Sequence, residues 1–424
     1  MQPKTKEKLK EIGKGLGVLV IVGTIINGPD LMKAAKIDYS LGNFLRMSTF
    51  VERIGDIGKE IIREITSFGC GPSHLIVKKQ KYEPLVEDAA NKFLTGSYKG
   101  NKALIIADIL GESELNEYAN SRAGARGLMQ LLPSTAADEL RSGIAIERSK
   151  IGNKHYENYI YETLRGKGID LLDPKTNIEL GCRILMNYCR ELGGDIKLGL
   201  AAYNCGLPLV KKICELRDKH DNLTKRYAYE DIKQRLPSET KQYVPKVLAY
   251  YKLFRDFYWP VSNYRAIGSN FGMRFHPILH EWREHTGDDV RASKYEPVYS
   301  PVEGVVQLAR WKGGYGNCVE IKDKDGLPYF VRYGHLDTIF VREGATIKRG
   351  QMIGRIGSTG LSTGAHLHIE IIVQGYYQDP GLFLDGKEEY FIEGVDKIVK
   401  KDVEIAMLKA PISEVNKSRQ YYKQ

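Results

Sequence analysis

Residues 103–140 read ALIIADILGESELNEYANSRAGARGLMQLLPSTAADEL. The apolar residues from Leu104 to Leu110 predict a helix, and that helix ends at Gly111-Glu112-Ser113. A carboxyl group at the end of an apolar helix is partly withdrawn from water, which raises its pKa and keeps it protonated near neutral pH. The stretch therefore predicts a helical domain in which Glu112 is a candidate proton donor to a glycosidic oxygen.

The helical pattern continues on both sides of this stretch, over residues 82–258, and predicts an all-α domain of several short helices. The pattern changes at Tyr258-Trp259-Pro260. Short β-rich runs separated by glycines follow, such as His366–Ile371, and they predict an antiparallel β domain over residues 259–385. The predicted fold class is therefore multidomain α+β, with an all-α domain followed by a β domain.

The two ends of the chain lie outside these domains. Residues 1–81 are predicted to be a helical N-terminal region, in which a lysine-rich start precedes the apolar run Leu16–Ile26. That run suits a secretory signal or a membrane anchor. A core or partner-binding helix is the alternative, because a membrane span needs about 20 apolar residues. An amphipathic helix is expected over 41–68, and residues 386–424 form a charged tail that is expected to be partly helical.

The composition is that of a globular protein. The 424 residues are 42% hydrophobic and 27% charged, and the net charge of +10 favours binding to an anionic polymer such as a bacterial wall. Because no nucleic-acid-binding module is recognisable, we expect no specific nucleic-acid partner. Four cysteines of the helical domain lack a CxxC pair, which argues against a thiolate zinc site. They are interpreted as small buried residues, with a disulfide as the alternative: Cys182, Cys189, Cys205 and Cys214.

Histidines concentrate in the predicted β domain. Of the nine in the chain, six lie between His276 and His368, which calls for a metal or a proton-transfer explanation. His285 and Asp289 are four residues apart, and His366 and His368 share one face of a strand because strand side chains alternate. Two histidines, an aspartate and one open position make a catalytic zinc arrangement.

Four ordered blocks of the helical domain resemble the soluble lytic transglycosylases, the relatives of goose lysozyme. Glu112-Ser113 is followed by Gly124–Gln130, and the later blocks are Asp173–Leu185, Leu200–Gly206 and Pro237–Val247. The resemblance covers about residues 85–255. It implies a lysozyme-like fold and a cleft that binds a glycan strand.

This resemblance implies that Glu112 is the sole catalytic acid and base. Glu112 would protonate the leaving oxygen and then deprotonate the C6 hydroxyl of the sugar, which gives a 1,6-anhydro end. A hydrolase would normally need a second carboxylate, and Glu114 is expected to be a surface charge. Core packing is the alternative for Tyr203. The residues implied to bind the sugar are Ser113, Gln130, Tyr203 and Asn204.

Residues 259–384 resemble the lysostaphin-type zinc endopeptidases. The matching motifs include Phe271–Arg274, His285-Thr286-Gly287 with Asp289, Tyr333–Leu336 and His366–Glu370. The resemblance covers nearly the whole predicted β domain. It implies a peptidase that cuts the peptide cross-links of bacterial walls.

The second resemblance also implies the roles of the histidines. His285, Asp289 and His368 would bind one Zn²⁺ ion, while His335 and His366 would position the water, take its proton and stabilise the oxyanion. Asp288 stands where the family usually has an apolar residue. It is expected to be exposed, with a supporting role beside the ligands as the alternative.

Together the resemblances imply an enzyme that degrades peptidoglycan, both a lytic transglycosylase and a zinc metalloendopeptidase. The pairing suggests local opening of the wall for a conjugation apparatus or a phage tail. We therefore expect the protein at the cell surface, outside the cell or on a virion, with membrane contact through residues 1–81. Two alternatives remain: a structural wall-binding component of a virion or secretion machine, and a housekeeping wall-remodelling hydrolase.

Overall fold

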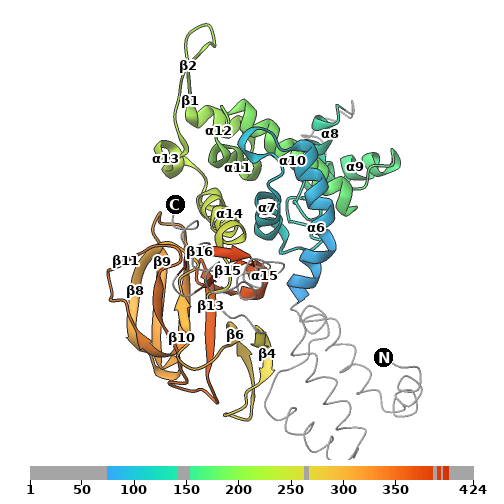
Figure 1. The fold of residues 1–424 in the computed structure, drawn as a ribbon. Coiled ribbons are helices and arrows are strands. Elements are labelled where there is room, and N and C mark those ends of the chain that lie inside the picture. The colour runs from blue at the N-terminus through green and yellow to red at the C-terminus, as the bar shows by residue number, and fades with distance from the viewer. Residues whose placement is uncertain (1–73, 142–152, 262–266, 385–388, 393–394, 401–424) are drawn as a thin grey trace, which may run out of the picture. The chain divides into compact units, whose positions relative to one another are not determined.

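The structure is a computed structural model that describes residues 74–141, 153–261, 267–384, 389–392 and 395–400 (Figure 1). The predictions made for the signal or anchor and for the helix over 41–68 lie outside these residues. Among the helices that are described, none has both the length and the apolar character needed to cross a membrane.

The first domain is built from helices, as the sequence predicts. Its longest members are α6 (His74–Phe93), α10 (Pro174–Glu191) and α14 (Ser238–Asp256). Helix α10 starts at Pro174 because Asp173 accepts a hydrogen bond from the backbone N–H of Thr176 at 2.8 Å. The shorter helices are α7 (Lys102–Ser113), α8 (Pro133–Glu139), α9 (Asn153–Gly166), α11 (Ile196–Cys205), α12 (Leu207–Cys214) and α13 (Tyr229–Ile232).

Helix α7 carries the candidate acid and packs against both α6 and α14. Every residue from Leu104 to Leu110 is buried, so the helix delivers Glu112 to the edge of the core. The contact with α14 is close at Gly111, where an added Cβ would lie 2.8 Å from Val247 Cγ2. Glycine at this position therefore lets the end of α7 approach α14.

The side chain of Asn177, on α10, holds the loop that follows α7 by hydrogen bonds. The buried Asn177 side chain donates to the carbonyl oxygens of Arg126 and Leu171, and it accepts from the Met129 N–H at 2.7 Å. Gly127 has a φ of 75°, and a Cβ there would lie 2.4 Å from the Asn177 amide. The sequence blocks around Gly127 and Asn177 thus meet in space as one structural unit.

One element of this domain is not helical. Strands β1 (Glu215–Arg217) and β2 (Leu223–Arg226) form an antiparallel hairpin that the helical pattern does not predict. Its turn is closed locally, because Asp218 accepts hydrogen bonds from the N–H groups of His220 and Asn222. Hydrogen bonds of this kind, from a side chain to the backbone of its own turn, do not change the spacing of apolar residues, so that spacing cannot predict the hairpin.

The cysteines of the helical domain are free thiols. Cys182, Cys189 and Cys214 are buried and Cys205 is partly buried, as expected for small core residues. The disulfide alternative is not formed among them.

The second domain is an antiparallel sheet, and the fold class predicted from the sequence is confirmed. The main path runs β11-β8-β9-β10-β13-β6-β3, and β7, β12 and β14 pair at its sides (Figure 1). A separate hairpin joins β4 (Gly272–Phe275) and β5 (Trp282–His285). The sheet strands are β3 (Ile267–Ser269), β6 (Asp288–Arg291), β7 (Pro297–Tyr299), β8 (Gly304–Trp311), β9 (Asn317–Asp323), β10 (Tyr329–Ile339), β11 (Thr346–Ile347), β12 (Met352–Ile356), β13 (His366–Val373) and β14 (Tyr376–Gln378).

Strand β13 lies inside the sheet and organises the candidate metal centre. It pairs with β6 on one side and β10 on the other, and it is buried along nearly its whole length. The register sets His368 opposite Asp289 of β6 and opposite Gly334 of β10. Residues almost 80 positions apart in sequence therefore meet because of strand pairing.

Helix α14 also contacts the β domain. The Lys252 ammonium group donates to the Asp323 carboxylate at 2.5 Å, and the Asp323 side chain is fully buried. The Phe254 ring lies 4.8 Å, centroid to centroid, from Phe383 of α15 (Pro380–Leu384). The hydrophobic core therefore continues from one domain into the other.

The tail is described only over two strands. β15 (Glu389–Ile392) and β16 (Val395–Lys400) form an antiparallel hairpin, and the partly helical tail stays a prediction for the residues beyond them. The β-branched and aromatic residues of Tyr390–Ile392 and Ile398–Val399 favour strands over helices. The rest of the tail, from residue 401, lies outside the described residues.

Candidate functional site

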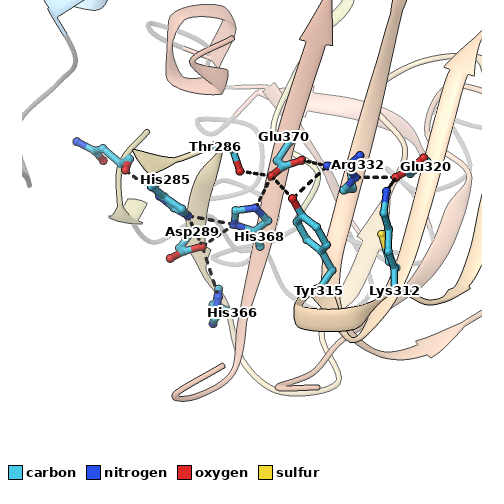
Figure 2. Close-up of polar contacts among 12 residues, drawn as sticks. His285, Thr286, Asp289, Lys312, Tyr315, Glu320, Arg332, His366, His368 and Glu370 are labelled. Carbon is cyan, nitrogen blue, oxygen red and sulfur yellow. Dashed lines mark hydrogen bonds and ion pairs between the residues drawn. The ribbon is translucent and has the colours of Figure 1, made fainter. Parts of the chain in front are cut away.

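Three side chains with metal-binding atoms converge beside β13. One nitrogen or oxygen atom from each of His285, Asp289 and His368 lies within 4.8 Å of the other two. His285 Nε2 lies 3.1 Å from His368 Nδ1, and the Asp289 carboxylate lies 2.9 Å from that same Nδ1 (Figure 2). Two imidazoles and one carboxylate form a donor set that suits zinc.

In each histidine of the donor set, one ring nitrogen hydrogen-bonds to a group outside the set. That bond decides which nitrogen faces the other donor atoms. His285 Nδ1 lies 2.8 Å from the carbonyl oxygen of Asn270, so Nδ1 donates there and Nε2 keeps its lone pair. His368 is arranged the other way round. Its Nε2 lies 3.1 Å from Glu370, so its Nδ1 faces the cluster.

Glu370 anchors a buried polar network behind His368. Its fully buried carboxylate accepts hydrogen bonds from Thr286, from the Tyr315 hydroxyl at 2.9 Å and from Arg332 (Figure 2). Arg332 also donates to Glu320 at 2.7 Å. Burial alone would raise the pKa of Glu370, but these donors outweigh it and hold that pKa below its ordinary value.

A second pair of histidines lies beside the donor set. The rings of His335 and His366 are 4.8 Å apart, and His366 Nε2 lies 3.4 Å from Asp289. Both rings use Nδ1 toward a backbone carbonyl at 2.8 Å, from Thr359 and Gly364 respectively. If Nδ1 carries the proton in both rings, Nε2 is left with a lone pair that can accept one.

His335 sits where β10 is irregular. The register with β9 shifts between Tyr333 and Leu336, and His335 has a φ of 61°, in the left-handed region. Residues other than glycine hold this conformation only when their surroundings fix it, and such strain concentrates at functional sites. Burial lowers the pKa of His335 to about 4, so its ring is neutral at pH 7.

The charges in the cluster follow from these contacts. Burial would raise the pKa of Asp289, but its contacts with His285, His366 and His368 outweigh burial and hold that pKa far below its ordinary value. Burial lowers the pKa of His285. At neutral pH Asp289 is therefore ionised and His285 is neutral. Burial would lower the pKa of His368, but its contacts with Asp289 and Glu370 outweigh burial and raise that pKa to about 9, so the ring gives up a proton when a metal binds.

Asp288 is not exposed, which corrects the expectation from the sequence. Its side chain is buried and accepts a hydrogen bond from the Phe271 N–H at 2.8 Å. Burial, together with the neighbouring Asp379, raises its pKa to about 7. Because strand side chains alternate, Asp288 points away from the face that carries Asp289, into the contact with α15 near Gly381.

In the helical domain, Glu112 lies in the last turn of α7 and is partly buried. Burial and the nearby Asp108 carboxyl group raise its pKa, as a proton donor requires. Tyr243 of α14 interacts with Glu112 and donates its hydroxyl proton to Asp108 at 2.5 Å. Glu114 is exposed, as expected of a surface charge.

The four residues predicted to bind sugar have hydrogen bonds within the protein. Gln130 donates to the carbonyl oxygens of Ala119 and Gly127, and the Tyr203 hydroxyl donates to the Met129 carbonyl at 2.8 Å. Tyr203 also interacts with Glu112, so the structure brings these two together. Asn204 accepts from Thr240, and Ser113 donates to Ile109. These bonds fix the four side chains within the helical domain.

Several residues of both sites were not selected from the sequence. Glu370 had a signal, because it stands two residues after His368 and must share its strand face. Asp108 had one as well, since it is the single charge inside the apolar part of α7, one turn before Glu112. Tyr315 stands in a motif, Tyr315-Gly316-Asn317, that also matches the endopeptidase family, but nothing local gives it a role. Arg332 had no signal, because only the pairing of distant strands brings it to Glu370.

Two family models match the chain. Residues 90–224 match the model described as Transglycosylase SLT domain, and residues 283–380 match the model described as Peptidase family M23. The chain therefore carries an SLT domain followed by a peptidase family M23 domain.

Individual relatives match the β domain. The chain is 44% identical over 117 residues to DD-carboxypeptidase/endopeptidase Mpg of Neisseria meningitidis, which is 28% of this chain and 26% of that protein. It is 42% identical over 118 residues to Peptidoglycan DD-endopeptidase ShyA of Vibrio cholerae, covering 28% and 27%. The chain thus spans about a quarter of the length of these curated relatives. A solved zinc-containing peptidase from Vibrio cholerae is 39% identical, with a TM-score of 0.27, over 29% of this chain and 38% of that one.

Proposed function

We propose that this protein degrades peptidoglycan at two sites, cutting glycan strands in the helical domain and peptide cross-links in the β domain. The observation that carries the proposal is the cluster of His285, Asp289 and His368 with its flanking histidines. Support comes from the SLT match of the helical domain and from the peptidoglycan endopeptidase named among the relatives of the β domain.

The donor set fits zinc, and His285, Asp289 and His368 would hold one ion. Zinc supplies Lewis-acid polarisation of the scissile carbonyl and activation of water. Asn270 and Glu370 orient the two ligand rings in advance, so the donor atoms already face one another.

The remaining histidines suit the proton transfers of peptide cleavage. His335 is neutral at pH 7, and Nε2 of His335 or His366 can take a proton from the attacking water. The ring then carries a positive charge beside the developing oxyanion and stabilises it.

Glu112 suits glycan cleavage because its raised pKa keeps a proton available for the leaving oxygen. After the bond breaks, the carboxylate takes the proton of the sugar C6 hydroxyl, and that oxygen closes a 1,6-anhydro ring. One carboxyl group thus serves as acid and then as base.

Metal analysis of the purified chain tests the peptide-cutting site. We expect about one zinc per chain and its loss in His368→Ala, because two donors cannot close a tetrahedral site. His220→Ala, in the exposed hairpin turn, is the matched control and should keep its zinc. Full zinc retention in His368→Ala would show that the ligand set is wrong.

Digestion of purified sacculi tests the glycan-cutting site. Glu112→Gln should lower the release of 1,6-anhydro products by at least about 100-fold, whereas Glu114→Gln should not. Ordinary reducing ends from the wild-type protein would rule out the transglycosylase assignment. If the wild-type protein binds sacculi but cuts neither bond, the wall-binding alternative is correct.

We further propose that the protein acts at the cell surface and opens the wall locally for a conjugation apparatus or a phage tail. The presence of both domains on one chain supports this, because cutting both polymers removes a patch of wall. Deleting the gene should then reduce conjugative transfer or phage entry while cell division stays normal. A division defect instead would favour the housekeeping alternative.

A further inference from the structure

Asp108 is an unusual residue to find in the middle of α7. Its side chain is fully buried and its neighbours from Leu104 to Leu110 are apolar apart from itself. One carboxyl oxygen, Oδ1, accepts the Tyr243 hydroxyl proton at 2.5 Å, while Oδ2 has no hydrogen-bond partner among the described residues. A buried, half-satisfied carboxyl group destabilises a fold, so its presence needs an explanation.

The position of Asp108 supplies that explanation. It precedes Glu112 by four residues, so both carboxyl groups lie on the same face of α7. Tyr243 interacts with both of them. A phenol has a single proton, and while Tyr243 donates it to Asp108 that proton is not available to an ionised Glu112, whose pKa a hydrogen bond from Tyr243 lowers.

Other charged groups lie around this pair on the elements that pack against α7. On α14, Lys246 opposes the effect of Asp108 on Glu112, and Glu239 adds to it. The Lys246 ammonium group is itself bound to the Gly111 carbonyl at 3.2 Å. On α6, Glu83 is paired with Lys102 at the opposite end of α7. The remaining titratable neighbours are neutral at pH 7: Cys182 and Cys189 of α10, Tyr203 of α11 and Tyr243 of α14.

We propose that Asp108 is a positioning residue for Glu112: it engages the only proton of Tyr243 and places a carboxylate one helical turn below the acid, so that Glu112 keeps its proton until the glycan is cut. Burial raises the pKa of both carboxyl groups, and Asp108 raises that of Glu112 further, which agrees with this arrangement. The proposal rests on the proposed role of Glu112.

The test is the pH profile of glycan cleavage by the full chain, with the helical circular dichroism and thermal unfolding of the same sample as the control for folding. Asp108→Asn keeps the acceptor for Tyr243 and removes the charge, so the alkaline limb of glycan cleavage should move to lower pH by roughly one unit. Asp108→Leu also frees the Tyr243 proton, so its limb should move further. Adding Tyr243→Phe to Asp108→Leu removes that donor and should reverse part of the shift.

Glu215→Gln is the matched control, because Glu215 is a buried carboxylate of the same domain that pairs with Arg217 and Arg226. It should leave the pH profile unchanged. An Asp108→Asn profile that loses amplitude but keeps the wild-type alkaline limb would show a purely structural role and overturn the proposal. If Asp108→Leu does not fold, Asp108→Asn alone decides. Glu112→Gln separates the two hypotheses, because undiminished glycan cleavage in that variant would contradict the role of Glu112 itself.

Discussion

Single residues show how the protein sets the charge of buried carboxyl groups in opposite directions. Glu370 receives four donors, and its pKa stays below the ordinary value. Asp108 receives one donor, and the contacts of Glu112 with Tyr243 and Lys246 do not outweigh its burial, so burial raises the pKa of both carboxyl groups. The first arrangement suits a fixed negative charge behind a metal ligand, and the second suits a proton donor.

Glu370 gives a prediction at this scale. Glu370→Gln keeps the shape of the side chain but removes the charge that orients His368 and that faces Arg332. We expect zinc affinity to fall about 10- to 100-fold, as measured by competition with a chelator. Glu343→Gln, which removes an exposed partner of Arg310, is the control and should bind zinc normally. Equal affinity in both variants would mean that the network behind His368 has no part in binding.

At the scale of elements, the site depends on how closely β6 and β13 approach. An added Cβ at Gly287 would lie 2.1 Å from the Ile369 carbonyl oxygen of β13. Gly287→Ala must therefore push apart the segments that carry His285 and His368. We predict that this single methyl group lowers zinc content in dialysed protein more than Gly364→Ala does, because a Cβ at Gly364 meets nothing within 4 Å. A normal zinc content in Gly287→Ala would show that the turn can adjust without moving a ligand.

Much of this arrangement could be predicted from local sequence. The helix that ends at Glu112 and the strand that carries His366 and His368 follow from periodicity, because each depends on neighbours in the chain. Family resemblance supplied the partnership of His285, Asp289 and His368. Their meeting depends on the register of β6 against β13, which no local pattern encodes.

The failures have the same physical origin. Asp288 was expected to be exposed, but α15 covers it, and a contact between distant segments cannot be inferred from a single acidic residue. The hairpin β1–β2 depends on hydrogen bonds of Asp218 within its own turn. The roles of Asp108 and Glu370 depend on which donors reach them, so only tertiary structure reveals them.

At the scale of the whole molecule, the two domains share contacts rather than a bare linker. The partly buried Lys252–Asp323 ion pair and the Phe254–Phe383 contact join α14 to the β domain. A charge such as Asp323, fully buried, is destabilising once its partner is removed. Separating the domains should therefore weaken each of them even where its own site is complete.

We predict that fragments 82–258 and 259–385 each retain one activity, glycan and peptide cleavage respectively, but unfold at lower temperature than the intact chain. The intact chain should also clear sacculi faster than an equimolar mixture, because one chain holds both sites near the same patch of wall. Turbidity of sacculi and thermal unfolding measure the two effects. Equal clearance would remove the proximity argument and leave both activities intact.

The metal donor set lies in the β domain, and the described residues of the helical domain hold no second group of three metal-binding side chains. A chelator should thus leave the protein with one activity, so that it shortens glycan chains and leaves the peptide bridges in place. A covalent mesh cut along only one of its two directions stays connected far longer than one cut along both. Removing or restoring zinc would then slow or speed the rate at which the mesh comes apart.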